Sequence, residues 1–248
     1  MKTSKTALTC RFFPIDAVSV THLRDMYQVF SRYYANTDLE TFVNDMSRKS
    51  GVFLLREKKG QRIVGFSTWT EVPLQYNGKK SIGVFSGDTI LEKDYWGNKA
   101  LQQAFAVRML KLKLTKPGTK VFWLLISKGY KTYLLLANNF FRHYPNHNSH
   151  NKRLVNLVDQ YCEKLFPDYY DRENRLLDFG ENSQHLKDEV ADITVNMREN
   201  NHRIRFFDDT NPSWRRGTEL PCVGEVCTRT LMGFFHKQLS GRRTTAVQ

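Results

Sequence analysis

The chain has few cysteines and no long apolar run. Its four cysteines are scattered over 248 residues, and only Cys222 and Cys227 lie near each other. No second pair or close histidine set completes a zinc pattern, so we expect reduced thiols and no bound metal. No apolar run approaches the ~20 residues of a membrane-spanning helix. The first sixteen residues have no sustained apolar stretch either. We therefore predict a cytoplasmic protein without a signal peptide or membrane span.

Acidic residues are also scarce. The 25 Asp and Glu stand against 38 Lys and Arg, which gives a formal net charge of +13. Such an excess of positive charge attracts polyanions and acidic partners over long range. Phosphorylated cofactors, acidic carrier proteins and nucleic acid are compatible with it, and solubility alone explains it equally well. Because the sequence has no aromatic ribonucleoprotein motif, nucleic acid is the least favoured of these partners.

The most informative stretch runs from Lys80 to Leu114. Ser81–Leu91 is rich in β-branched and aromatic residues and has the length of a strand. A polar break follows, and from Asn98 the apolar residues recur at mostly helical spacing. A strand that runs through a short loop into a helix directs unpaired backbone N–H groups at one point, where the helix macrodipole adds positive potential. This predicts an anion site, most often for phosphate, at Trp96–Leu101.

The segments on either side predict further elements. Periodicity, capping residues and apolar runs indicate two helices, a hairpin whose second strand ends at Pro73, then a buried strand and a further helix after Leu114. The ranges are Ala17–Tyr34, Thr37–Arg48, Val52–Glu57, Arg62–Val72, Val121–Ser127 and Tyr130–Asn139. The first ten residues are expected to be a frayed start.

This order of elements resembles the GNAT acyltransferase superfamily. The resemblance rests on the hairpin with Ile63-Val64-Gly65 and on Thr89–Gly97 (TILEKDYWG), which is similar to the fourth strand and the acyl-CoA pyrophosphate loop of that family. It covers about Arg11 to Pro145. It implies an α/β fold, with a mixed sheet of α+β type flanked by helices. It also implies acyl transfer from a thioester donor to an amine of a small molecule. The donor would be acyl-CoA or an acyl-carrier protein, since a basic surface suits an acidic carrier.

The loop departs from the family pattern. That pattern has Gln or Arg, two residues, Gly, one residue, then Gly or Ala. Here Trp96 stands at the first position, Lys99 at the first Gly and Leu101 at the second. Glycines at these places let the backbone approach a pyrophosphate closely. Their loss leaves three outcomes open: the Lys99 ammonium supplies the charge, the donor sits differently, or donor binding is lost.

The resemblance also implies which residues meet the donor. They are the strand backbone that a splayed gap between the fourth and fifth strands of the family exposes to the pantetheine arm, the loop at the diphosphate and a hydroxyl near the leaving sulfur. In this sequence they are Thr89, Ile90, Leu91, Trp96, Gly97, Asn98, Lys99, Ala100, Leu101 and Ser127.

Asp88 is the candidate base for the incoming amine. On an alternating strand it shares a face with Ser86 and Ile90, just before the proposed thioester position. A desolvated carboxylate there would have a raised pKa suited to general-base work. A structural hydrogen bond to the neighbouring turn is the alternative, and Glu71 is a weaker rival for the role.

The acid that protonates the leaving thiolate is less defined. The family often uses a tyrosine in the helix after the fifth strand, a place that falls near Leu135–Leu136. The nearest hydroxyl candidates are Tyr130 and Tyr133, and Tyr133 is preferred because a helical tyrosine is the usual solution in the family. A capped helix start with an aromatic residue in the core is the alternative.

Three histidines invite a metal hypothesis. His143, His147 and His150 are separated by four and three residues in a stretch that contains Pro and Asn. That composition argues against a helix-borne ligand pair, so we interpret the stretch as a surface loop.

About a hundred residues follow Pro145. They predict an amphipathic helix at Asn151–Phe166, a weak helix at His185–Asn200, a strand at Arg203–Phe207 and a long loop over 208–226, in which Trp214 is a candidate pocket wall. We expect one compact unit made of a flexible start (1–10), an acyltransferase core (11–150), an extension (151–240) and a basic tail (241–248). A non-catalytic GNAT-fold binding module and, less favoured, an RNA-binding or RNA-modifying protein are the alternative functions.

Overall fold

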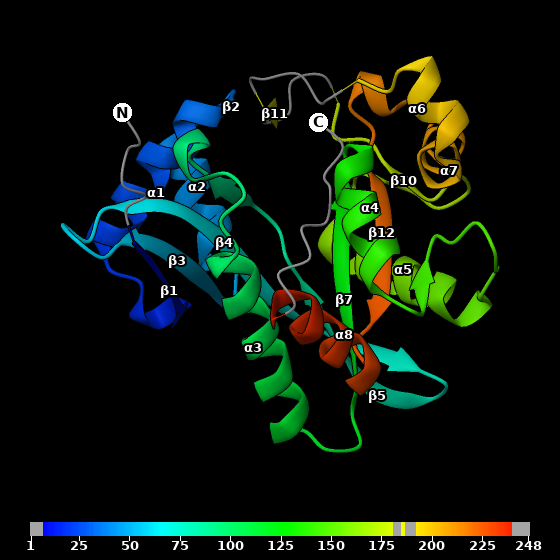
Figure 1. Ribbon diagram of the computed structural model, residues 1–248, viewed down its shortest axis with the longest axis horizontal. Coiled ribbons are helices and arrows are strands. Elements are labelled where there is room, and N and C mark those ends of the chain that lie inside the picture. Colours follow the sequence, from blue (N-terminus) through cyan, green and yellow to red (C-terminus); the bar gives the residue numbers. More distant parts are fainter. Residues whose placement is uncertain (1–6, 181–184, 187–191, 240–248) are drawn as a thin grey trace.

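The computed structural model describes residues 7–180, 185–186 and 192–239. Eight strands form one mixed sheet in the order β1-β3-β4-β5-β7-β12-β8, with β6 paired to β4 (Figure 1). They are β1 (Leu8–Pro14), β3 (Gly51–Glu57), β4 (Ile63–Tyr76), β5 (Lys79–Phe85), β6 (Thr89–Leu91), β7 (Lys120–Ser127), β8 (His143–Tyr144) and β12 (Leu220–Glu225). Two short ribbons pair β2 (Tyr34–Ala35) with β11 (His185–Leu186), and β9 (Tyr170–Asp171) with β10 (Leu176–Leu177). The predicted mixed α/β class is confirmed.

The helices cover both faces of the sheet. They are α1 (Val20–Tyr33), α2 (Leu39–Ser47), α3 (Ala100–Thr115), α4 (Tyr130–Asn139), α5 (Lys152–Leu165), α6 (Val195–Asn200), α7 (His202–Thr210) and α8 (Thr228–Leu239). Because side chains alternate along β4, Phe66 packs with α1 and α2, and Val72 packs with α5, all on one face. Trp69 points to the other face, where α3 lies. In the described part of the chain, no helix combines the length and the apolar character that crossing a bilayer requires.

Local capping explains where α1 and α2 begin. The Ser19 hydroxyl accepts the His22 N–H, and the Asp38 carboxylate accepts the Thr41 N–H, so each satisfies an otherwise unpaired donor of its first helical turn. Both helices were predicted, and their bounds differ from the prediction by a few residues. The helix at Tyr130–Asn139 has the predicted bounds.

Residues 8–10, which were predicted to be part of a frayed start, form a strand instead. Leu8–Pro14 forms β1 and pairs antiparallel with the whole of β3, from Leu8 opposite Glu57 to Pro14 opposite Gly51. Residues 1–6, like the predicted basic tail, lie outside the described residues.

Pro73 does not end its strand. β4 continues to Tyr76, although proline lacks the N–H that a central strand would donate. Beyond Trp69 the neighbour β3 has ended, so this half of β4 pairs on one side only, with β5. The Lys164 ammonium donates to the Pro73 carbonyl, and the Gln160 amide exchanges hydrogen bonds of 2.8 and 2.9 Å with the Gln75 backbone. Pro73 therefore faces an edge that side chains of α5 cover.

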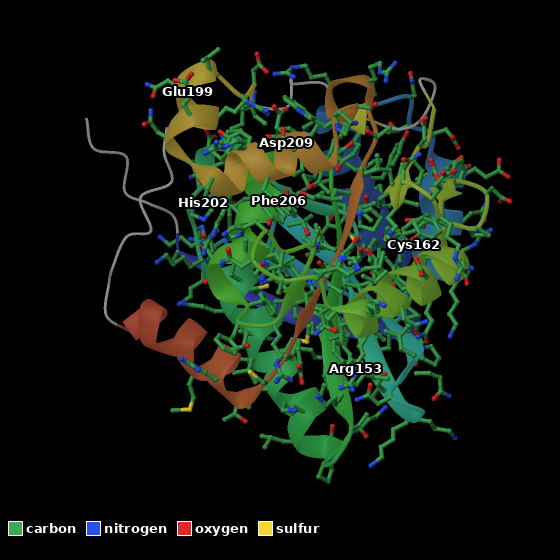
Figure 2. The ribbon with its side chains drawn as sticks, turned by 90° about the vertical axis from the view of Figure 1, so that its right-hand side faces the viewer. Arg153, Cys162, Glu199, His202, Phe206 and Asp209 are labelled. Atoms are coloured by element: carbon green, nitrogen blue, oxygen red, sulfur yellow. The ribbon has the colours of Figure 1, made fainter. Side chains whose placement is uncertain are left out.

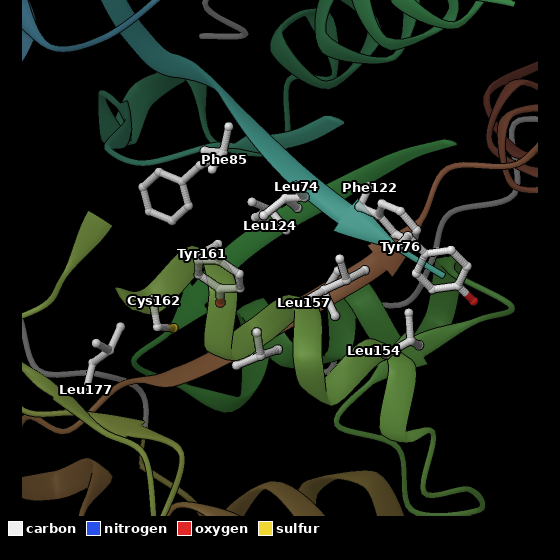
Figure 3. Close-up of a cluster of buried hydrophobic side chains, with 13 residues drawn as sticks. Leu74, Tyr76, Phe85, Phe122, Leu124, Leu154, Leu157, Tyr161, Cys162 and Leu177 are labelled. Carbon is white, nitrogen blue, oxygen red and sulfur yellow. The ribbon is translucent and has the colours of Figure 1, made fainter. Parts of the chain in front are cut away.

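Helix α5 fixes the second half of the sheet. Leu157 and Tyr161 are fully buried against β4, β5 and β7, in the cluster drawn in Figure 3. The Tyr161 hydroxyl lies 3.1 Å from the Leu125 carbonyl and 3.3 Å from the Cys222 carbonyl, which belong to adjacent strands. A single buried phenol thus ties α5 to both β7 and β12.

The extension departs most from the prediction. Arg203–Phe207 is helical, within α7, because Asn201 caps the helix and its apolar residues Ile204 and Phe207 pack against α4. The predicted helix at His185–Asn200 reduces to α6, preceded by the two residues of β11 and by 187–191, which are outside the described residues. The predicted loop over 208–226 contains β12, whose six residues are all buried between β7 and β8. Trp214 is buried in the α4–α7 cluster.

Candidate functional site

The strand that returns after β4 is divided in two. β5 runs parallel to β7 as far as Phe85 opposite Leu124, and the Ser86 N–H donates to the Leu124 carbonyl at 3.2 Å. After the bend at Ser86–Asp88 the chain resumes as β6, which pairs with β4 alone. A Cβ on Gly87 would lie 2.8 Å from the Thr68 hydroxyl, so this bend requires glycine. The parallel pair β5–β7 therefore diverges at the point that the resemblance predicted (Figure 1).

One backbone edge of β6 consequently pairs with no strand among the described residues. Asp88 and Glu92 hydrogen-bond to β4, since the Thr68 N–H donates to the Asp88 carbonyl and the Glu92 N–H to the Val64 carbonyl. In an antiparallel pair alternate residues turn their backbone groups the same way, so those of Thr89 and Leu91 face away from β4. The Trp96 indole N–H donates to this edge, at 2.8 Å from the Leu91 carbonyl.

A charged network positions the segment between β6 and α3. Glu92 is 7% exposed and accepts hydrogen bonds of 2.8 Å from both Arg62 and Arg32. The Tyr95 hydroxyl donates to Glu57, and the Lys93 N–H donates to the Tyr33 hydroxyl at 3.1 Å. Because two guanidinium groups compensate the buried carboxylate, the chain enters the following turn in a defined direction.

The turn then opens into the N-terminus of α3. Gly97 has a φ of +80°, which favours glycine. Lys99 is the N-cap residue, and the Asn98 side chain accepts the Ala100 N–H at 2.8 Å. Among the described residues, no partner is found for the N–H groups of Leu101 and Gln102. The first turn has no acidic residue, so the end of the helix is electropositive.

Two carboxylates, those of Asp88 and Glu219, precede the strands β6 and β12 on either side of β7's divergent end. Asp88 lies in the bend before β6 and not on an alternating strand as predicted, and Glu219 precedes β12, bridged by its backbone to Leu177. Burial raises the pKa of Glu219 to about 7; the Asp88 charge adds to the shift and Lys128 opposes it. Burial likewise raises the pKa of Asp88, against the opposing charge of Lys49. Burial, the Asp88 charge and the Glu219 charge raise the pKa of Tyr34, so its hydroxyl lies within the electrostatic influence of both carboxylates.

Glu219 was not found from the sequence. It lies in the segment interpreted as loop, where Pro, Gly and Asp are dense. The apolar residues Leu220, Cys222, Val223 and Val226 could have signalled a strand, with Glu219 at its start. Glu219 comes near Asp88 only because β12, which follows Glu219, pairs with β7 in the sheet.

The other predicted catalytic residues are placed as follows. Tyr133 is fully buried between α4 and α7, and its hydroxyl lies 3.4 Å from the Pro145 carbonyl. Tyr130 begins α4 and is 6% exposed, and burial raises its pKa. The Ser127 hydroxyl donates to the Gly129 carbonyl at 2.9 Å. Glu71 accepts the Trp69 indole N–H and lies beyond the half of β4 that pairs with β6.

The histidine stretch is less exposed than predicted. His143 is 7% exposed and its Nδ1 lies 2.8 Å from the Phe140 carbonyl. The rings of His147 and His202 are 4.4 Å apart at their centroids, and His202 and Phe206 lie on α7 in Figure 2. Within residues 7–180, 185–186 and 192–239, no cluster of at least three His, Cys, Asp or Glu side chains could hold a metal ion.

Of the comparisons with known proteins, the one with solved structures found similar chains. No protein-family model matches the chain. No curated protein matches it in sequence. Solved structures do resemble it over about half its length, among them a probable N-acyltransferase and two acetyltransferases.

Three such structures illustrate this. A probable N-acyltransferase from Enterococcus faecalis has a TM-score of 0.41 and 12% identity, covering 54% of this chain and 33% of that one. A GNAT family N-acetyltransferase from Escherichia coli, in complex with CoA, has a TM-score of 0.38 and 12% identity, covering 55% and 74%. A Trypanosoma brucei acetyltransferase has a TM-score of 0.37 and 18% identity, covering 58% and 99%. The chain thus spans a third of the first of these proteins.

Proposed function

We propose that the protein is a divergent GNAT-like N-acyltransferase that transfers an acyl group from a thioester donor, most simply acyl-CoA, to an amine of a small molecule. One observation carries the proposal: β6 separates from β7 and leads, through a short turn, into the electropositive N-terminus of α3. An extended donor with an anionic end matches a strand edge that leads to an anion site.

The donor would lie along this edge. The N–H groups of Leu101 and Gln102, with the Lys99 ammonium, would hold a diphosphate without the family glycines. The backbone of Thr89 and Leu91 would hydrogen-bond the pantetheine arm. A backbone N–H aimed at the thioester carbonyl would stabilise the negative charge that develops on its oxygen during attack.

Glu219 is the proposed base. A carboxylate with a pKa of about 7 is both available as the anion and basic enough to take a proton from an ammonium or amine at neutral pH. The amine nitrogen then attacks the thioester carbon, the C–S bond breaks and the thiolate takes a proton. Burial keeps the pKa of Glu219 raised, and the Asp88 charge adds to the shift. We assign the thiolate's acid to Tyr130, because the Tyr133 hydroxyl already contacts the Pro145 carbonyl.

A second candidate has an observation of its own. The Trp96 indole N–H donates a hydrogen bond to the Leu91 carbonyl, on the edge where the donor would bind. This contact favours a GNAT-fold binding module that has lost its donor. An acyl-carrier protein remains a proposed donor on the strength of the net charge of +13.

Thermal unfolding with candidate donors separates these functions. We expect CoA, acetyl-CoA, a long-chain acyl-CoA or an acylated carrier protein to stabilise the parent chain by about 2.7 kcal/mol at 100 times its dissociation constant. Lys99→Glu should abolish the shift, because it places a negative charge at the diphosphate position. Lys113→Glu at the far end of α3 is the matched charge reversal and should retain it. If no donor shifts the unfolding temperature, the binding module is the correct function.

Replacing Trp96 tests whether its indole competes with the donor. Trp96→Ala removes a hydrogen bond of ordinary strength, about 0.5–1.5 kcal/mol, from the edge. We therefore expect donor affinity to increase by about 2–10-fold in a calorimetric titration. Trp96→Phe keeps a ring without the N–H and should reproduce the increase. Weaker donor binding in both variants would instead mean that Trp96 contacts the donor directly.

A further inference from the structure

A cavity of about 300 Å³ lies on the opposite half of the sheet from the divergence. Its lining residues come from β1, β3 and the turn between β3 and β4: Thr9, Arg11, Phe13, Leu54, Arg56 and Gln61. In the sheet order, β3 and β4 separate β1 from β6, so this cavity is distinct from the proposed donor edge. Nothing in the acyl-transfer proposal uses it.

Two arginines place their charges in this cavity. Thr9 pairs with Arg56 and Arg11 with Leu54, so Arg11 and Arg56 are diagonal neighbours on one face of the β1–β3 pair. Like charges in such positions repel. The Arg11 charge contributes to a lowered pKa of Arg56, after burial as the larger cause. Among the described residues, no carboxylate lies within ion-pair distance of either guanidinium. The nearest one to influence Arg56, Asp25, is bonded to Arg24 at 2.9 Å.

The hydrogen bonds of Arg56 are incomplete. Its Nε is buried and has no hydrogen-bond partner among the described residues. Its Nη2 lies 2.6 Å from the His22 Nε2, while the Ser19 N–H points at the other ring nitrogen of His22 at 3.3 Å. Burial and the Arg56 charge lower the pKa of His22, so the ring is neutral and has one acceptor nitrogen for two donors. The half-buried guanidinium thus has one buried N–H, at Nε, without an acceptor among the described residues.

The walls define what kind of ligand would complete the site. Phe13 and Leu54 contribute apolar surface, and the Arg56 guanidinium lies 5.2 Å from the centroid of the Phe13 ring. Thr9 and Gln61 add a hydroxyl and an amide. A phosphate or carboxylate oxygen would accept from Arg11 and Arg56 together, and a small apolar body would contact Phe13.

We propose that this cavity, formed by Arg11 and Arg56 above Phe13, is a second ligand site that binds a small organic anion, a phosphate or carboxylate joined to a compact apolar group. The anion supplies the acceptor that Nε of Arg56 lacks, and it relieves the repulsion between the two arginines.

Titration of the full chain with defined probes tests this site. The probes are phenyl phosphate, benzoate, inorganic phosphate and uncharged benzamide, followed by calorimetry and by the amide NMR shifts of Thr9 and Gln61. We expect phenyl phosphate or benzoate to bind and to shift both amides, and benzamide to bind at least 10-fold more weakly. If phenyl phosphate binds and benzoate does not, the ligand is a phosphate, and the reverse identifies a carboxylate.

Matched variants decide whether the arginines are responsible. Arg56→Gln and Arg11→Gln should each weaken binding at least 10-fold, whereas Arg24→Gln removes the same charge from exposed helix α1 and should leave it unchanged. Arg56→Lys keeps the charge and checks folding. The proposal is overturned if no probe binds, if Arg24→Gln weakens binding equally, or if acetyl-CoA displaces the probe. The last result would assign the cavity to the donor site, and a failure here leaves the acyl-transfer test unaffected.

Discussion

Glu219→Gln is expected to lower kcat/KM for acylation of the amine by about 10²–10⁴-fold, the usual contribution of a general base. The substitution preserves the size of the side chain and removes its ability to accept a proton. Initial rates, measured with the donor that stabilises the chain, provide the test. Glu163→Gln, on exposed α5, removes the same charge outside the site and should retain the parent rate.

The pH dependence gives an independent readout of the same residue. A base must be deprotonated to act, so kcat/KM of the parent should rise with pH through a midpoint near 7, the pKa of Glu219. Glu219→Gln should lose this limb of the profile. An unchanged limb with a reduced rate would indicate that Glu219 only shapes the site, and an unchanged rate would exclude it as the base.

The same substitution should stabilise the fold above neutral pH. The folded-state pKa of Glu219 lies above its value of 4.5 in the unfolded chain, so the fold favours the protonated form. Stability is then lost as pH rises from about 4.5 through 7, and the glutamine variant escapes this loss. We expect a gain of about 1–3 kcal/mol at pH 8 and almost none at pH 4. Lower stability at pH 8 would contradict the assigned desolvation.

Of the substitutions described, Trp69→Ala should produce the largest loss in the free energy of unfolding. Trp69 is fully buried, with Phe12, Phe53 and Phe105 within 6.1 Å of it between ring centroids, and the Arg108 guanidinium lies 5.7 Å from its ring. This cluster joins β1, β3 and β4 to α3. Truncation of a buried tryptophan costs about 3–5 kcal/mol. In a chain of this size that lowers the unfolding temperature by about 6–20 °C.

Trp96→Ala is the matched control for this measurement. Trp96 is 64% exposed and makes one side-chain hydrogen bond, so its removal should change the free energy of unfolding by no more than about 1.5 kcal/mol. Urea unfolding of both variants compares the two tryptophans directly. Equal losses would mean that Trp69 contributes little packing or that the Trp96–Leu91 contact supports the fold.

Local patterns predicted most of the core and little of the extension. Helix α4 follows from periodicity, and the turn before α3 follows from the change of pattern at Asn98. β1 was missed because LTCRFFP has no alternation, and its place depends on β3. The continuation of β4 through Pro73 depends on Lys164 and Gln160, which lie far away in the sequence.

The candidate site was predicted on one side only. Asp88 and the residues from Thr89 to Leu101 are close in sequence, so their arrangement could be inferred from one stretch. Glu219 and Tyr34 come within electrostatic range of Asp88 through the pairing of β12 with β7 and the return of α1, and no local pattern encodes such pairings. The family resemblance predicted that β6 separates from β7, and the strand pairing shows this separation.

The position of β12 also determines when the protein can become active during synthesis. Leu220 pairs with Ser127, and the intervening residues must be made before the strand can enter the sheet. Pairing at such separation closes slowly. Until then β7 presents an unpaired edge of the Val121–Ser127 apolar run, a surface prone to aggregation. A nascent or truncated chain that stops before Glu219 would therefore lack both β12 and the proposed base, so completion of the proposed site is a late event in folding.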